Sequence, residues 1–119
     1  MPQLILNFYK AFKNSWNGLK NAWHFQWAFK VEVIILIIAM PCAFYLGKTA
    51  VERVLLISSV LLLLIMELIN SAIETTVNRI GFEYHELSGL AKDLASAAIF
   101  LAGFNVLVIW GIFLFYSIR

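Results

Sequence analysis

Three long uncharged apolar stretches follow a more polar N-terminal segment. They run over 33–47, 54–66 and 94–118, and each is bounded by charged residues. A membrane-spanning helix needs about 20 mostly apolar residues, which the third stretch supplies alone. The first reaches this length if Lys30 and Glu32 extend toward the membrane surface, and the second only if Glu67 lies inside the helix. The pattern predicts transmembrane helices at 30–47, 51–79 and 91–117.

The segment 1–29 has a different pattern. Its large apolar residues recur every three or four positions, as on one face of a helix: Ile5, Phe8, Phe12, Trp16, Leu19 and Trp23. Lysines and asparagines fill much of the remaining surface. A basic helix with aromatic residues on its apolar face is typical of the membrane surface, so we expect an amphipathic surface helix. A helix packed only on its own protein is the alternative.

Composition supports a membrane protein with a single domain. The 119 residues are 62% hydrophobic and 13% charged, and the mean hydropathy is +0.85. Soluble domains are roughly half apolar and about a quarter charged, so a water-soluble globule is excluded. The net charge of +2 is too small to indicate a nucleic-acid partner. Cys42 is the only cysteine, which excludes an intrachain disulfide. We also expect no removable signal peptide, because no basic segment with a small-residue cleavage site begins the chain.

The positions of lysine and arginine predict the orientation. Six of these cations flank one side of the spans and three the other: Lys10, Lys13, Lys20, Lys30, Arg79 and Lys92 against Lys48, Arg53 and Arg119. Positive residues are more frequent on the cytoplasmic side. We therefore expect the N-terminus and the 80–92 loop to be cytoplasmic.

The second span carries a polar stripe. Glu67, Asn70, Ser71, Glu74 and Asn78 recur along an otherwise apolar helix. At 100° per residue, Glu67 and Glu74 lie two turns apart and only about 20° out of register. Carboxylates within a membrane are costly and usually face a bundle interior or a cavity. The stripe indicates a functional site near the cytoplasmic face, although a hydrogen-bonded stripe that joins helices is an alternative.

A second polar cluster lies in the predicted loop 80–90 and at the start of the third span. It comprises Glu83, Tyr84, His85, Glu86, Ser88, Lys92 and Asp93. We expect Asp93 to start a helix whose alanines at 91, 95, 98 and 102 form a seam for close packing. Because the chain re-enters the membrane here, both polar clusters would lie at one membrane face, where their oxygen ligands could hold a divalent ion. A merely solvated loop is the alternative.

The order of these polar residues resembles the signature of the prokaryotic integral-membrane diacylglycerol kinases. The matching segments are Glu67–Glu74, Arg79–Gly81, Glu83–Gly89 and Ala91–Asp93. Segments similar to the Gram-negative branch are Ser15–Trp16, Gly18–Leu19, Ala22–Trp23, Ala28–Phe29, Glu32 and Arg53–Ser59. The likeness therefore extends over nearly the whole chain.

The resemblance implies an all-α membrane protein that forms a homotrimeric helical bundle in the bacterial inner membrane. It implies Mg²⁺-dependent transfer of the ATP γ-phosphate to the primary hydroxyl of diacylglycerol, which gives phosphatidic acid. By the same resemblance, Glu67 is the general base and Asn70 assists it, while Glu74 and Gln26 hold Mg²⁺. The implied nucleotide-binding residues are Glu74, Gln26, Glu83, Tyr84, His85, Lys92, Asp93 and Asn14, and the implied lipid-binding residues are Ser15, Trp16, Glu32, Glu67 and Ser96.

Three positions depart from the family's pattern. Gln26 stands where a second metal-binding carboxylate is usual, Asn78 where aspartate is common, and Asn7 where arginine is frequent. Glu67, Asn70 and Glu74 are unaffected, so an active kinase is still expected. An undecaprenol kinase of the same fold and a non-catalytic membrane bundle are the alternatives.

Overall fold

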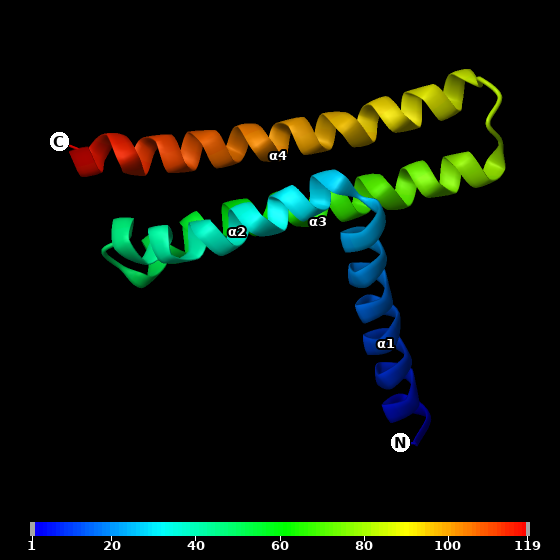
Figure 1. Ribbon diagram of the computed structural model, residues 1–119, viewed down its shortest axis with the longest axis horizontal. Helices are drawn as coiled ribbons and strands as arrows, with labels where there is room; N and C mark the ends of the chain where they lie inside the picture. Colours follow the sequence, from blue (N-terminus) through cyan, green and yellow to red (C-terminus); the bar gives the residue numbers. More distant parts are fainter. Residues whose placement is uncertain (1, 119) are drawn as a thin grey trace.

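The computed structural model describes residues 2–118, which form four helices. They are α1 (Pro2–Phe25), α2 (Trp27–Leu46), α3 (Ala50–Ile80) and α4 (Glu86–Ile118). Figure 1 shows α2, α3 and α4 running alongside one another, while α1 leaves them at a steep angle. Arg119, one of the three cations expected on the outer side, lies outside the described residues.

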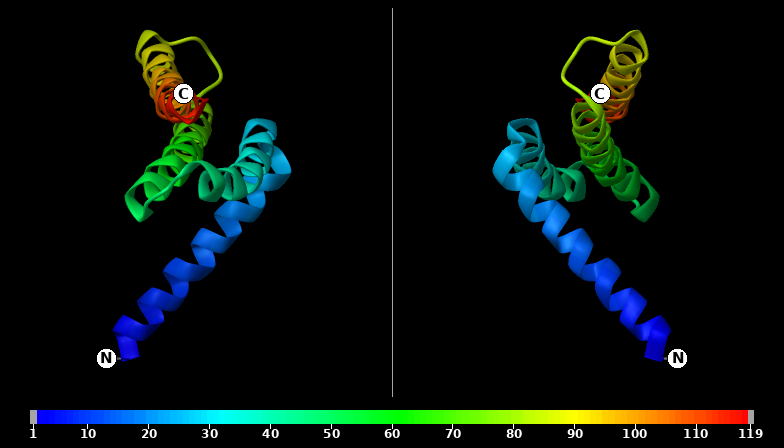
Figure 2. Two further views of the ribbon diagram at one scale, coloured as in Figure 1. Left: turned by 90° about the vertical axis from the view of Figure 1, so that its left-hand side faces the viewer. Right: turned by 90° about the vertical axis from the view of Figure 1, so that its right-hand side faces the viewer.

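Helix α3 is the centre of the bundle. It packs most extensively against α4 and also against α2, whereas α2 and α4 scarcely touch. The end-on views show this order, with α3 between its two neighbours (Figure 2). The predicted alanine seam is confirmed, because Ala95 and Ala102 are buried. Small side chains allow the backbones of two membrane helices to approach closely, which explains the tight α3–α4 pairing.

A tryptophan joins α4 to α3 within the apolar region. The indole N–H of Trp110 donates to the carbonyl of Leu56 at 3.1 Å and to the Ser59 hydroxyl at 3.1 Å. Ser59 is buried and donates in turn to the Leu56 carbonyl at 2.8 Å. A buried indole N–H needs a hydrogen-bond partner, so this pair of acceptors fixes the lateral position of α4.

Hydrogen bonds between residues that precede and follow the turn stabilise the connection between α2 and α3. Thr49 caps α3, accepting from the backbone N–H of Glu52 at 3.2 Å, and the Glu52 carboxylate accepts from the N–H of Lys48 at 2.7 Å. This reciprocal arrangement is close to a capping box. Arg53 Nε donates to the Gly47 carbonyl at 3.2 Å, and its guanidinium lies 5.3 Å from the centre of the Phe44 ring. The turn lies at the bundle end opposite residues 81–85 (Figure 1).

Helix α1 is exposed along most of its length, and Ala22 is its only buried residue in the described chain. It meets the bundle near its C-terminal end, where Ala22, Phe29 and Leu64 form a small hydrophobic cluster. The Lys30 ammonium lies 5.2 Å from the centre of the Trp23 ring, across the junction with α2. Phe8 and Phe12 remain exposed. Within a single chain α1 therefore does not pack along its own bundle, and its apolar face stays available to a membrane surface.

The three predicted spans correspond to α2, α3 and α4, which are long and apolar enough to cross a membrane. The expectation that Asp93 starts a helix was wrong, because α4 begins at Glu86. Helices α2 and α4 thus extend beyond the predicted span starts at residues 30 and 91, since α2 begins at Trp27. The loop is therefore confined to 81–85 instead of 80–90. Residues 86–90 join the helix because His85 Nδ1 accepts from the backbone N–H of Leu87 at 3.1 Å and because acidic Glu86 favours a helix N-terminus.

Candidate active site

Three polar side chains are buried between α2 and α3 in the half of the bundle nearer the 81–85 loop. Glu67 is 6% exposed, Asn70 is 8% exposed, and Glu32 on α2 is 9% exposed. Glu32 Oε1 and Asn70 Oδ1 have no hydrogen-bond partner within the chain. Buried polar atoms are normally paired, so these two orphaned acceptors mark a site that a ligand or water can complete.

The polar stripe on α3 continues toward the loop. Asn70 Nδ2 donates to Glu74 Oε1 at 3.2 Å. The two residues are one helical turn apart, which places their side chains on the same face. This bond uses one of the two amide hydrogens of Asn70, and the amide oxygen has no partner. The predicted stripe is therefore a connected arrangement of a half-buried carboxylate and a buried amide.

The 81–85 loop and the start of α4 form a second part of the site. Lys92 Nζ donates to Asn78 Oδ1 on α3 at 3.0 Å. Both residues line a cavity of about 270 Å³, together with Glu83, Tyr84 and His85. The structure thus brings the predicted loop residues and Lys92 around one hollow. Asp93 does not line this cavity and is exposed.

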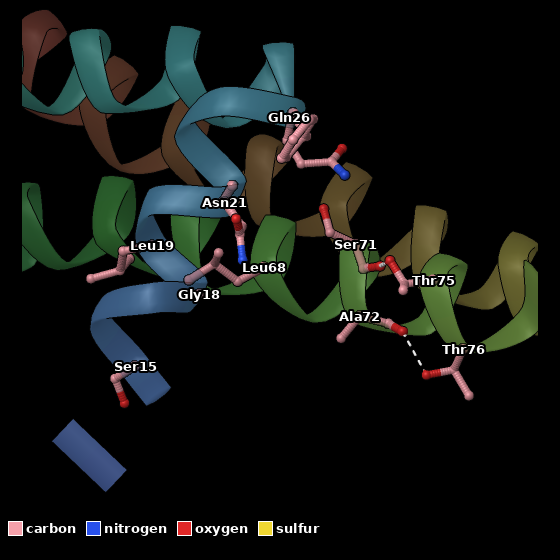
Figure 3. Close-up of a pocket in the computed structure, with 12 residues that line it drawn as sticks. Ser15, Gly18, Leu19, Asn21, Gln26, Leu68, Ser71, Ala72, Thr75 and Thr76 are labelled. Carbon is pink, nitrogen blue, oxygen red and sulfur yellow. Dashed lines mark hydrogen bonds between the residues drawn. The ribbon is translucent and has the colours of Figure 1, made fainter. Parts of the chain in front are cut away.

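A larger groove of about 910 Å³ lies between α1 and α3. Ser15, Asn21 and Gln26 line it from α1 and the junction with α2, and Ser71 and Thr75 line it from α3 (Figure 3). Its remaining lining residues are mainly small or apolar: Gly18, Leu19, Ala22, Phe25, Leu68, Ala72 and Thr76. Among residues 2–118, no charged side chain lines the groove.

The structure brings only some of the predicted site residues together. Gln26 lines the α1–α3 groove and Glu74 does not, so the two proposed metal ligands do not share that groove. The other predicted residues, which lie on exposed helix surfaces outside both cavities, are Asn14, Trp16 and Ser96.

Sequence reasoning missed two features of the site. It placed Asn78 in the polar stripe but did not predict its hydrogen bond to Lys92, and it assigned no role to Thr75 and Thr76, which line the groove. A four-residue spacing from Ser71 to Thr75 could have indicated a shared face. The contact between Asn78 and Lys92 joins two helices, so no local pattern could have identified it.

The fold and the site together define a class of protein. Three apolar helices with buried carboxylates, a lateral groove and a loop cavity lined by Lys92 of α4 form a multi-pass membrane protein with a polar site at one end of its bundle. Among residues 2–118, no group of three or more histidine, cysteine, aspartate or glutamate side chains could hold a metal ion alone.

Comparison with known proteins identifies the family. The model of the prokaryotic diacylglycerol kinase family matches residues 13–114. A diacylglycerol kinase of Haemophilus influenzae is 50% identical over 104 residues, which cover 87% of this chain and 88% of the relative. One from Escherichia coli K12 is 50% identical over 105 residues, covering 88% and 86%. One from Helicobacter pylori is 42% identical over 106 residues, covering 89% and 83%.

The chain belongs to the prokaryotic diacylglycerol kinase family. It is an enzyme of lipid metabolism, a diacylglycerol kinase, and as a kinase it uses ATP. The resemblance seen in the polar motif is thereby confirmed. The alternative of a non-catalytic bundle does not fit this membership.

Proposed function

We propose that the protein transfers the γ-phosphoryl group of ATP to the primary hydroxyl of a membrane diacylglycerol. The hydroxyl oxygen forms a bond to the γ-phosphorus while the bond from that phosphorus to the β–γ bridging oxygen breaks. ADP leaves, the hydroxyl proton passes to a protein base, and the product is phosphatidic acid. Phosphoryl transfer requires mainly alignment and charge stabilisation, which a small membrane site can supply.

Glu67 is the proposed general base, and its position carries the proposal. This carboxylate is 6% exposed. It lies on a helix apolar enough to span a membrane, in the half of the bundle nearer the 81–85 loop. Burial keeps bulk water from competing with the lipid hydroxyl for this carboxylate. Asn70, one turn away, donates one amide hydrogen to Glu74 and has a second, which it can donate to the lipid hydroxyl oxygen. This would hold the hydroxyl near Glu67 while its single proton stays directed at the Glu67 carboxylate.

The donor atoms of Glu74 and Gln26 are of the kind that Mg²⁺ arriving with nucleotide prefers, although the two side chains do not line the same groove within one chain. Glu74 supplies a half-buried carboxylate and Gln26 an amide oxygen, and Mg²⁺ commonly combines one or two carboxylates with water and substrate phosphates. The ion would supply charge neutralisation at the phosphates when bound. The chain's own contribution is to fix the orientation of Glu74, whose Oε1 accepts from the Asn70 amide at 3.2 Å.

The loop cavity is the proposed place for nucleotide contacts. Lys92 offers a positive charge for phosphate, and Glu83, Tyr84 and His85 line the same hollow. Asp93 and Asn14 are further proposed nucleotide contacts. The proposed lipid contacts beyond Glu67 are Ser15, Trp16, Glu32 and Ser96.

We also propose a homotrimer with the N-terminus and the 81–85 loop in the cytoplasm of a bacterial inner membrane. Most of the apolar surface of α4 is exposed in the single chain, so lipid or neighbouring subunits must cover it. The lysine and arginine distribution supports the orientation. A cytoplasmic loop also gives the nucleotide-contacting residues access to ATP.

The test is transfer of radiolabel from γ-labelled ATP by purified protein in detergent micelles. Parallel reactions contain dioleoylglycerol or undecaprenol, with Mg²⁺ supplied. We expect label in phosphatidic acid from the wild type and a loss of about 10²–10⁴-fold in Glu67→Gln, the usual contribution of a general base. Glu52→Gln is the matched control, because this carboxylate is on the same helix at the opposite end of the bundle.

Label only in the polyprenyl phosphate would keep the mechanism and replace the acceptor. An active, folded Glu67→Gln variant would remove Glu67 from the role of base. Loss of activity in the Glu52 variant as well would show that the assay reports α3 stability instead of chemistry, and circular dichroism of each variant provides that check.

A further inference from the structure

Lys92 is held by a side chain from a different helix. Its Nζ lies 3.0 Å from Asn78 Oδ1, across the contact between α3 and α4. Both side chains are half-buried, and both line the cavity at the 81–85 loop. The bond therefore fixes a cation at the wall of a hollow that also contains Glu83, Tyr84 and His85.

The chemistry of the acceptor is as important as its position. A lysine ammonium sits on a flexible four-carbon chain and shifts readily among rotamers. The Asn78 amide oxygen restrains it but carries no charge. Among the described residues, Lys92 makes no ion pair with a carboxylate, and its side chain donates its hydrogen bond to Asn78. The ammonium is thus positioned while its charge remains available to an anion.

Other charged or titratable groups near this cavity do not replace that contact. Glu83 and His85 line the cavity on the loop side, and Arg79 follows Asn78 on α3. All three are exposed and screened by water. The half-buried hydrogen bond between Asn78 and Lys92 therefore connects α3 to the cavity proposed for nucleotide contacts.

We propose that Asn78 is a positioning residue for nucleotide binding, which it serves by orienting the Lys92 ammonium toward the ATP phosphates. This inference rests on the proposed role of Lys92 as a nucleotide contact. Asn78 acts through Lys92 and does not itself touch the substrate. It follows that removing the acceptor weakens nucleotide binding, and that lipid binding is unaffected.

The experiment compares Asn78→Leu, which has a similar volume and no acceptor, with Asn78→Asp, which keeps one. The full-length protein in micelles is titrated with a fluorescent Mg²⁺–ATP analogue to obtain Kd, and KM is measured separately for ATP and dioleoylglycerol. We expect Asn78→Leu to raise Kd and KM for ATP about tenfold, which corresponds to about 1.4 kcal/mol, with KM for lipid unchanged. Asn78→Asp restores most of this loss, although its carboxylate offsets part of the Lys92 charge.

A double-mutant cycle separates this role from simple helix pairing. In a Lys92→Gln background, Asn78→Leu should cause no further loss of nucleotide affinity, because the two changes remove the same interaction. Additive losses, equal rises in both KM values, or no rescue by Asn78→Asp would overturn the inference. An unchanged Kd in Lys92→Gln alone would instead refute the proposed role of Lys92, and with it the ground for Asn78. Asn78→Ala replaces the leucine variant if that variant does not fold.

Discussion

Gly47 lies where a methyl group has no space, and Gly47→Ala tests the packing of the α2–α3 turn. A Cβ added there would lie 2.7 Å from Arg53 Cγ, 3.0 Å from the Ala43 carbonyl oxygen and 3.1 Å from the Arg53 backbone nitrogen. The first distance is too short for any stable contact. Arg53 must therefore move, which strains its 3.2 Å hydrogen bond to the Gly47 carbonyl and its stacking on Phe44.

The expected cost combines two opposing effects. The backbone of Gly47 has φ −76° and ψ 133°, which alanine adopts without strain. Alanine therefore stabilises the fold by about 0.4–1 kcal/mol through the unfolded state, while overpacking costs about 1–3 kcal/mol. We expect a net decrease of about 1–2 kcal/mol in the free energy of unfolding, with the larger value if Arg53 loses its hydrogen bond.

The assay is unfolding in mixed micelles, followed by circular dichroism as the denaturing detergent increases. Gly18→Ala is the matched control, because nothing lies within 4 Å of an added Cβ there. This exposed helical position should gain about 0.5–1 kcal/mol. In an Arg53→Ala background, which lacks Cγ, the cost of Gly47→Ala should fall. Equal effects at both glycines, or a cost unchanged by Arg53→Ala, would refute the steric reasoning.

Three further predictions concern the α3–α4 contact and the metal ligand. Trp110→Phe loses the indole hydrogen bonds to Leu56 and Ser59. It should lower the free energy of unfolding by about 0.6–1.7 kcal/mol, as hydrogen bonds between membrane helices do. Unfolding in detergent measures this loss, and an unchanged stability would mean that water replaces the donor. Ala102→Leu overfills a position that is 5% exposed and should cost about 1–3 kcal/mol, measured in the same way, whereas a neutral result would show that α4 moves freely. Glu74→Gln keeps the oxygen that accepts from Asn70 but loses the charge, so the Mg²⁺ concentration for half-maximal activity should rise sharply; an unchanged metal titration would argue against its role as a ligand.

Much of the fold follows from local sequence patterns. Runs of apolar residues predict the three spans because a membrane core requires a minimum length of apolar helix. The spacing of Glu67 and Glu74 predicts a shared face because the helical period is fixed. The polar motif, extending from Glu67 to Asp93, was specific enough to indicate the family, and the family comparison confirmed it.

Helix boundaries in polar segments were less predictable. The residues 86–90 include the polar Glu86 and Ser88 as well as Gly89, which favoured a loop. The structure continues α4 through them, with the His85 ring accepting from the first turn. Polarity separates membrane from water, but it does not distinguish a loop from a helix that extends beyond the membrane.

The sequence by itself determined the number of spans, the amphipathic N-terminal segment and the polar stripe, since each depends on residues near one another along the chain. Only the tertiary structure decided which polar groups meet. It buried both Glu32 and Glu67, left the Asn70 oxygen without a partner, and joined Lys92 to Asn78. These contacts depend on how helices are rotated and offset against each other, and that arrangement arises from packing of the whole bundle.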